Sequence, residues 1–203
     1  MNLTVQELPY LVIYFMINID ARQGLDLSNY NGGVYVIDNL FPAWFSEYVH
    51  LHTICAPAWL FGRTSGENTG EIPAFVQHIF PPKSANAENN CFEMMCHALL
   101  RTLPPHELTD IVVNGQQHFH NTEFHTDCPG DDGLTFIYYV NMDYRTEWGG
   151  QTEVKVGNTL EVVDFIPGRV ALFKGNYQHR GCSFSIPTDS LRATVAIKVN
   201  LND

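Results

Sequence analysis

The pattern of hydrophobic and polar positions divides the chain into a helical part and a β-rich part. Two longer apolar runs with helical spacing predict helices at residues 43–55 and 91–103. Pro42 stands at the first turn of the first helix, where its missing N–H has no partner to lose, and Asn90 is expected to cap the second. Ahead of both helices, residues 33–39 alternate between apolar and polar positions and predict a strand.

After the second helix the pattern becomes that of a β protein. Short runs rich in Val, Ile, Thr, Tyr and Phe are separated by Gly, Pro, Asn and Asp, at residues 107–120, 135–141, 151–156, 159–165, 169–174 and 191–200. Gly157-Asn158 predicts a two-residue hairpin, and Pro167-Gly168 predicts a second tight turn. Many strands joined by tight turns favour an antiparallel sandwich or barrel of the jelly-roll kind, and helices that precede the strands argue against a βαβ sheet.

The chain is therefore predicted to form one mainly β domain with N-terminal helices, of the α+β class, over residues 1–203. Residues 1–109 would supply a strand and helices that support a β core at residues 110–203. The polar stretches at 63–73 and 81–90 predict loops.

Composition excludes several classes of function. A formal net charge of −11 disfavours nucleic-acid binding, although seven of the eleven Lys and Arg residues fall in the last 60 positions and could line a basic cavity for an anionic cosubstrate. Five cysteines without regular spacing indicate reduced thiols, a cytoplasmic location and no zinc site. The apolar residues 10–19 fit a buried strand or a short helix and are too short to cross a membrane, so no membrane association is expected.

The candidate chemistry begins at His125 and Asp127. They stand two residues apart, so in an extended segment both side chains leave the same face and can bind one ion. A distant third ligand, His179, would complete a facial triad that holds non-haem Fe(II) and leaves three positions open. The alternative for His179 is a surface histidine in the turn NYQHRG. His118 and His120 form a second same-face pair without a companion carboxylate and are expected to be wall or surface residues.

An ordered set of motifs extends this pair over residues 113–200, with a weaker match over 33–55. The motifs are His125-Thr126-Asp127, TFIYYVN at 135–141, Trp148-Gly149-Gly150, Pro167-Gly168 leading to Phe173, His179, and Arg192-Ala193-Thr194. Together they resemble the Fe(II)- and 2-oxoglutarate-dependent dioxygenases of the prolyl-4-hydroxylase-like branch. The resemblance implies a double-stranded β-helix, which is a cupin-like jelly roll.

The resemblance also implies a role for individual residues. His125, Asp127 and His179 would bind Fe(II). Arg192 would hold the distal carboxylate of 2-oxoglutarate through two parallel hydrogen bonds, with a hydroxyl from Thr194 two residues along the same face. Tyr139 matches the tyrosine that reaches the same carboxylate, and Thr135 shares its strand face. O2 would be the oxidant and ascorbate the expected reductant.

The chain departs from the family pattern in two places. A tyrosine found in some relatives about ten residues before the HxD histidine is absent, so Gln116 or His118 would take over its contact. The loop at 181–191 is longer than in similar proteins, which leaves the register of Arg192 open.

The expected activity is hydroxylation of a carbon centre, with a prolyl residue in a peptide or protein as the substrate. Trp148, Arg145 and Tyr177 would be contacts at the rim of the site. A free amino acid or another small molecule is the alternative substrate, and a jelly-roll binding module without catalysis is the alternative function. The sequence does not indicate an oligomeric state.

Overall fold

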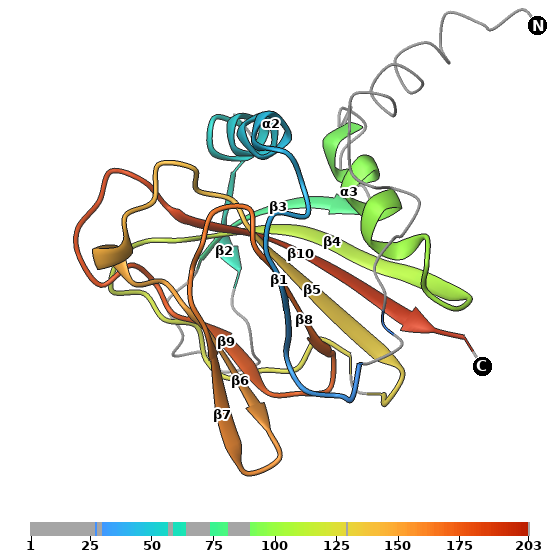
Figure 1. Ribbon diagram of the computed structural model, residues 1–203. Coiled ribbons are helices and arrows are strands. Elements are labelled where there is room, and N and C mark those ends of the chain that lie inside the picture. Colours follow the sequence, from blue (N-terminus) through green and yellow to red (C-terminus); the bar gives the residue numbers. More distant parts are fainter. Residues whose placement is uncertain are drawn as a thin grey trace, which may run out of the picture.

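Two antiparallel β-sheets and two α-helices form the part of the chain that the computed structural model describes, which is residues 27, 30–56, 59–63, 74–80, 90–128 and 130–202. The larger sheet has seven strands in the order β1-β8-β5-β10-β4-β3-β2, and the smaller has three in the order β7-β6-β9 (Figure 1). The strands are β1 (Tyr35–Ile37), β2 (Leu60–Arg63), β3 (Ala74–Phe80), β4 (His106–Gln116), β5 (Gly133–Tyr139), β6 (Thr152–Val156), β7 (Thr159–Val163), β8 (Val170–Lys174), β9 (His179–Gly181) and β10 (Arg192–Leu201). The prediction of a mainly β, double-stranded β-helix fold is confirmed.

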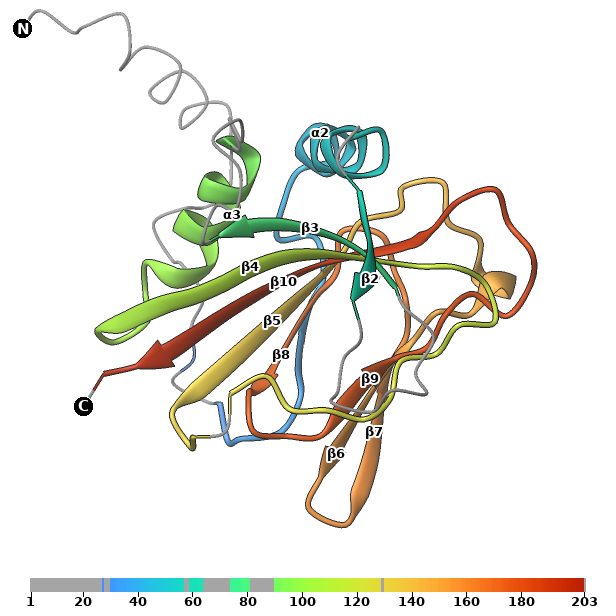
Figure 2. The same cartoon turned by 180° about the vertical axis from the view of Figure 1, so that it is seen from behind.

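The helices α2 (Ala43–Ile54) and α3 (Asn90–Leu100) cover one face of the larger sheet, and the smaller sheet lies at its other face (Figures 1 and 2). Both predicted helices are present. α3 begins at Asn90, and it ends at Leu100, after which the Leu103 N–H donates to the Leu100 carbonyl in a tighter turn. No helix among the described residues is long and apolar enough to cross a membrane.

Alternate residues of the larger sheet pack into two separate hydrophobic cores, one on each face of the sheet. On the helix side, Phe136 and Tyr138 of β5 pack with buried side chains of α2 and α3. On the other side, Ile137 and Tyr139 pack with the smaller sheet and with Phe173 of β8. The second face is the one that carries the polar cavity described below, so strand parity decides which side chains can reach it.

The central strand β10 fixes the positions of the polar side chains. It pairs with β4 on one edge and with β5 on the other. Arg192 lies opposite Gln116, and Lys198 lies opposite Thr135 on one neighbour and Asp110 on the other. These pairings place residues that are far apart in the sequence on one face of the sheet.

Three strands were not predicted from the sequence. β2 and β3 extend the larger sheet beyond β4, where Gln77 breaks the expected alternation because it is buried and donates to the Thr53 carbonyl. The short strand β9 lies in the stretch NYQHRG, where the sequence pattern indicates a turn. The predicted run at 107–120 ends as a strand at Gln116, shortly before Phe119 takes a φ of 62°. The loops expected after Arg63 and Phe80, and the apolar run at 10–19, lie largely outside the described residues.

Candidate active site

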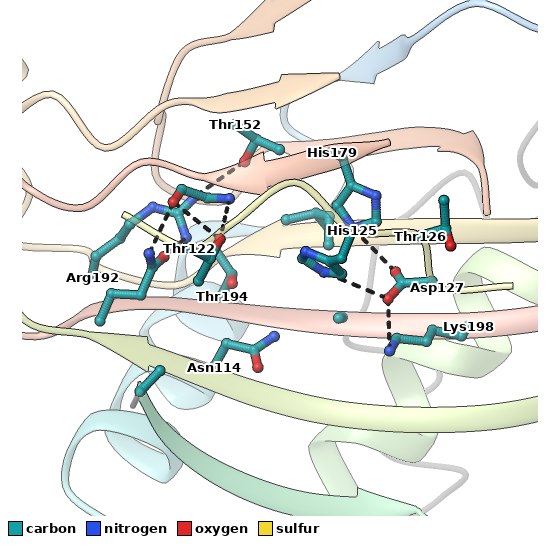
Figure 3. A pocket seen from close by; sticks show the side chains of 15 residues that line it. Asn114, Thr122, His125, Thr126, Asp127, Thr152, His179, Arg192, Thr194 and Lys198 are labelled. Carbon is teal, nitrogen blue, oxygen red and sulfur yellow. Dashed lines mark hydrogen bonds and ion pairs between the residues drawn. The ribbon is translucent and has the colours of Figure 1, made fainter. Parts of the chain in front are cut away.

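A cavity of about 280 Å³ is enclosed by residues of both sheets and of the loop that follows β4 (Figure 3). Its lining is mostly polar and comprises Ala74, Asn114, Gln116, Thr122, His125, Thr126, Asp127, Ile137, Thr152, His179, Gly181, Arg192, Thr194, Ala196 and Lys198. The two imidazoles and Asp127 stand at one end, which we call the metal end, and Arg192 stands at the other, which we call the anion end.

The metal end brings together His125, Asp127 and His179. Nε2 of His179 lies 3.4 Å from Oδ2 of Asp127, and Nε2 of His125 lies 3.9 Å from Oδ1 of the same carboxylate. One potential ligand atom from each residue lies within 4.8 Å of the others. The main chain makes this meeting possible, because residues 125 and 179 exchange both N–H to carbonyl hydrogen bonds, at 3.0 and 2.9 Å.

Both histidines are oriented as metal binding requires. Nδ1 of His125 lies 2.9 Å from the Glu123 carbonyl, and Nδ1 of His179 lies 3.0 Å from the Tyr177 carbonyl. Because a carbonyl oxygen only accepts, each Nδ1 carries a proton, and Nε2 is the nitrogen that faces the cavity and can be offered to a metal ion. Burial, together with the nearby His179, lowers the pKa of His125, so its neutral form is favoured.

Two donors hold the Asp127 carboxylate in place. Thr135 donates its hydroxyl proton to Oδ2 at 2.9 Å, and the Lys198 ammonium lies 2.8 Å from Oδ1. Burial alone would raise the pKa of Asp127, but its contacts with His179 and with the Lys198 ammonium outweigh burial and hold the pKa well below its usual range. The group is therefore an ionised ligand at neutral pH.

The anion end is built around Arg192, whose side chain is buried. Its guanidinium donates to the Gly150 carbonyl at 2.8 Å, to Oε1 of Gln116 at 2.7 Å and to Oγ1 of Thr152 at 3.0 Å. Among the described residues no carboxylate lies within ion-pair distance of it. A buried cation surrounded only by neutral oxygens favours an anionic ligand, because burial without a counter-charge is costly.

Thr152 presents a hydroxyl proton to this end of the cavity. Its Oγ1 accepts from the Tyr139 hydroxyl at 2.8 Å and from Arg192, so both lone pairs are used and its own proton remains to be donated. Tyr139 is fully buried behind Thr152 and does not line the cavity, and burial raises its pKa to about 12. The Tyr139 hydroxyl, which the sequence predicts to contact the cosubstrate, therefore reaches the cavity only through the Thr152 hydroxyl in this geometry.

The other residues expected near the cosubstrate fall into two groups. Thr194 and Gln116 line the cavity, and Gln116 also donates to the carbonyls of His120 and Gly181. Thr135 lies at the metal end and bonds Asp127, and His118 is not part of the lining.

The structure does not bring the expected rim residues to the cavity. Trp148 packs against Phe184 in the core, and together with Arg145 it borders a separate surface hollow. The Tyr177 hydroxyl donates to the Gly32 carbonyl. Sequence position relative to the matched strands does not determine where these side chains lie: Trp148 is buried in the core, and Tyr177 bonds Gly32.

Sequence reasoning also missed polar residues that do line the cavity. Lys198 shares strand parity with Arg192 and Thr194, so a fixed register for β10 would have found it. Thr152 stands two residues after Gly150, at the start of β6. Thr122 is brought in by the loop that precedes His125, where it donates to and accepts from Gly181.

Comparison with known proteins supports the same fold. No protein-family model and no curated protein matches the sequence. A prolyl-4-hydroxylase from Pseudomonas putida matches with a TM-score of 0.62 at 14% identity, covering 90% of this chain and 98% of that one. This chain shares the fold of that prolyl-4-hydroxylase.

Two further solved structures share this fold. A prolyl hydroxylase from Trichoplax adhaerens, in complex with a peptide fragment of the hypoxia-inducible factor, matches with a TM-score of 0.53 at 16% identity, over 98% of this chain and 93% of that one. HygX from Streptomyces hygroscopicus with iron bound matches with a TM-score of 0.56 at 13% identity, over 100% and 88%. HygX has also been solved with nickel and 2-oxoglutarate.

Proposed function

We propose that this protein is an Fe(II)- and 2-oxoglutarate-dependent dioxygenase that hydroxylates a carbon centre. The observation that carries the proposal is the composition of one cavity. Two imidazole Nε2 atoms and one ionised carboxylate converge at its metal end, and a buried guanidinium without an acidic partner among the described residues stands at its anion end. That donor set suits Fe(II), and the guanidinium suits the distal carboxylate of a dicarboxylic acid.

Each residue then has a defined task. His125, Asp127 and His179 would hold the ion from one side, so that its remaining positions face the cavity. Arg192 would pair with the distal carboxylate of 2-oxoglutarate, with hydroxyl donors from Thr152 and Thr194, and would so direct the 2-oxo acid group toward the metal end. When bound, iron and 2-oxoglutarate would couple O2 reduction to decarboxylation of the cosubstrate to succinate and CO2 and to insertion of oxygen into a substrate C–H bond.

The substrate in this proposal is a prolyl residue in a peptide or protein. Support comes from the sequence motifs and from the two prolyl hydroxylases that share the fold, one of which was solved with a peptide. Ascorbate would keep the iron reduced. All five cysteines are unpaired, which fits the reducing cytoplasm.

Succinate production tests the proposal. The purified protein is incubated with Fe(II), ascorbate and 2-oxoglutarate, alone, with a library of proline-containing peptides, or with free proline, and a His179→Ala variant serves as the control. We expect succinate that rises with peptides and is absent from the variant. Stimulation by free proline alone would instead indicate a small-molecule substrate, and no succinate under any condition would indicate a binding module.

A further inference from the structure

Lys198 places a fixed positive charge at the metal end of the cavity. Its side chain is only 12% exposed, and Nζ lies 2.8 Å from Oδ1 of Asp127 and 3.6 Å from Oδ2 of Asp110 (Figure 3). The register of β10 explains the position, because Lys198 stands directly opposite Asp110 on β4. The ammonium therefore lies between two carboxylates, one of which belongs to the proposed metal triad.

An ammonium and a divalent cation would compete for the same carboxylate. Thr135 already donates to Oδ2 of Asp127, so Lys198 supplies the second donor and the only full positive charge within ion-pair distance of that carboxylate, apart from any on the imidazoles, among the described residues. Without Lys198, the metal-free site would bury the Asp127 carboxylate with only Thr135 and the two imidazoles beside it, which is destabilising. With Lys198 in place, an incoming cation meets a carboxylate that is already neutralised and is repelled by the ammonium.

Asp110 offers the ammonium a second partner. Its Oδ2 is 3.6 Å from the same nitrogen, and its side chain is 21% exposed. A lysine side chain has several rotatable bonds, so a small rotation can bring Nζ closer to Asp110 as it leaves Asp127. An exchange of partners within one strand pair would keep the ammonium compensated while Asp127 binds a metal.

We propose that Lys198 is a positioning residue that acts as the counter-ion of Asp127 in the metal-free protein, competes with the metal for that carboxylate, and passes to Asp110 when the metal binds. The inference rests on the proposed function, since it takes the triad to be the metal site. It has a definite consequence: the metal affinity of this site is lower than that of the same three ligands without the lysine.

Mn(II) binding measures this competition without any turnover. Metal-free protein is titrated with Mn(II), and free Mn(II) is followed by electron paramagnetic resonance. We expect Lys198→Met to bind Mn(II) about tenfold more tightly than the wild type, because the ion no longer displaces an ammonium. Lys198→Arg keeps the charge and should stay within about threefold of the wild type. Lys174→Met removes the same charge outside the cavity lining and should change the affinity less than about twofold.

For a second variant we expect an effect on Mn(II) affinity of the opposite sign. Asp110→Asn removes the alternative partner of the ammonium, so the metal must displace a more tightly held lysine, and we expect Mn(II) affinity to fall by about fivefold. In the double variant Lys198→Met/Asp110→Asn this loss should disappear, because no ammonium remains to be accommodated. A general loosening of the structure would not give two single variants with opposite signs and a coupled double variant.

Thermal unfolding of the metal-free proteins gives an independent readout. Lys198→Met should unfold at a lower temperature than the wild type without metal and should recover with saturating Mn(II). If Lys198→Met were recovered only unfolded, Asp110→Asn decides alone: weaker binding supports the inference, and unchanged or tighter binding overturns it.

The two proposals fail in different ways. Unchanged or weaker Mn(II) binding by a folded Lys198→Met, with normal binding by the wild type, would overturn the role of Lys198 and leave the oxygenase proposal intact. If instead the wild type bound no Mn(II) that depends on His125 and His179, the proposed metal site itself would be rejected.

Discussion

The two ends of the cavity solve the problem of buried charge in opposite ways. At the metal end, the negative charge of Asp127 is matched by the ammonium of Lys198 before any ligand arrives. At the anion end, the positive charge of Arg192 meets only neutral oxygens among the residues that the structure describes, including those of Gln116 and Thr152. The metal end is thus compensated from within, whereas the anion end is left to be compensated by a ligand.

The two ends are also supported by different parts of the fold. At the metal end, residue 125 of a loop pairs through its main chain with the three-residue strand β9. Residues of three longer strands, β4, β6 and β10, form the anion end. The comparison predicts that substitutions at one end change the affinity for one ligand and leave the affinity for the other nearly unchanged.

Removal of the carboxylate should have the largest effect. In Asp127→Ala the metal end loses the anionic ligand of the triad, and Lys198 is left beside the two histidines. Loss of a direct ligand should exceed the effect of losing a supporting contact, so we expect Mn(II) affinity to fall by more than about 100-fold. Calorimetric titration with Mn(II) measures it, and the circular dichroism spectrum checks the fold. If the Mn(II) affinity of Asp127→Ala were within threefold of the wild-type value, Asp127 would not be a metal ligand.

Loss of the guanidinium should act on the other ligand. Arg192→Ala should leave Mn(II) affinity unchanged and weaken 2-oxoglutarate binding by about 1.5–3 kcal/mol, because a charge-assisted contact is lost. The measurement is 2-oxoglutarate titration of the Mn(II)-loaded protein. Arg192→Lys is the matched control, because it keeps the charge but not the two parallel hydrogen bonds. Its 2-oxoglutarate affinity should lie between those of the wild type and Arg192→Ala. Wild-type cosubstrate affinity in Arg192→Ala would mean that the distal carboxylate binds elsewhere.

The sequence predicted the two ends unequally well. His125 and Asp127 stand two residues apart, and this short spacing indicated the metal end because strand geometry puts both side chains on one face. The position of His179 depended on a family resemblance, since nothing local shows that a three-residue strand pairs with residue 125. The fold class followed from the β-rich pattern after residue 105 and was confirmed.

The anion end and the metal-end lysine depended on strand register, which sequence pattern does not supply. Thr152 is interposed between Tyr139 and the cavity only because β5 and β6 belong to different sheets. Lys198 reaches Asp127 because the register places it beside Asp110. The edge strand β2 and its neighbour β3 are hidden for a related reason, since Gln77 of β3 is buried whereas Leu60 and Phe61 of β2 are exposed, so burial does not follow polarity in either strand.

Loss of a supporting contact at the metal end should have an intermediate effect on Mn(II) affinity. Thr135→Val keeps the shape of the buried side chain and removes the hydroxyl that donates to Oδ2 of Asp127. The carboxylate then loses the hydrogen bond from Thr135 and keeps the contact with Lys198. We expect Mn(II) affinity to fall by about tenfold and 2-oxoglutarate affinity to stay the same. Competition between Mn(II) and a fluorescent chelator measures this change. Thr135→Ser restores the hydroxyl, so failure of serine to recover the affinity would show that packing and not hydrogen bonding is responsible.

The smallest effect should come from the residue behind the anion end. Tyr139→Phe removes the hydroxyl that donates to Thr152, so Thr152 is less firmly oriented toward the cavity. We expect 2-oxoglutarate affinity to fall by about 1 kcal/mol, which is less than for Arg192→Ala, and Mn(II) affinity to stay the same. In a Thr152→Val background the same change should have almost no effect on cosubstrate binding, because the intermediate contact is gone. An equal loss in both backgrounds would instead support direct contact between the Tyr139 hydroxyl and the cosubstrate.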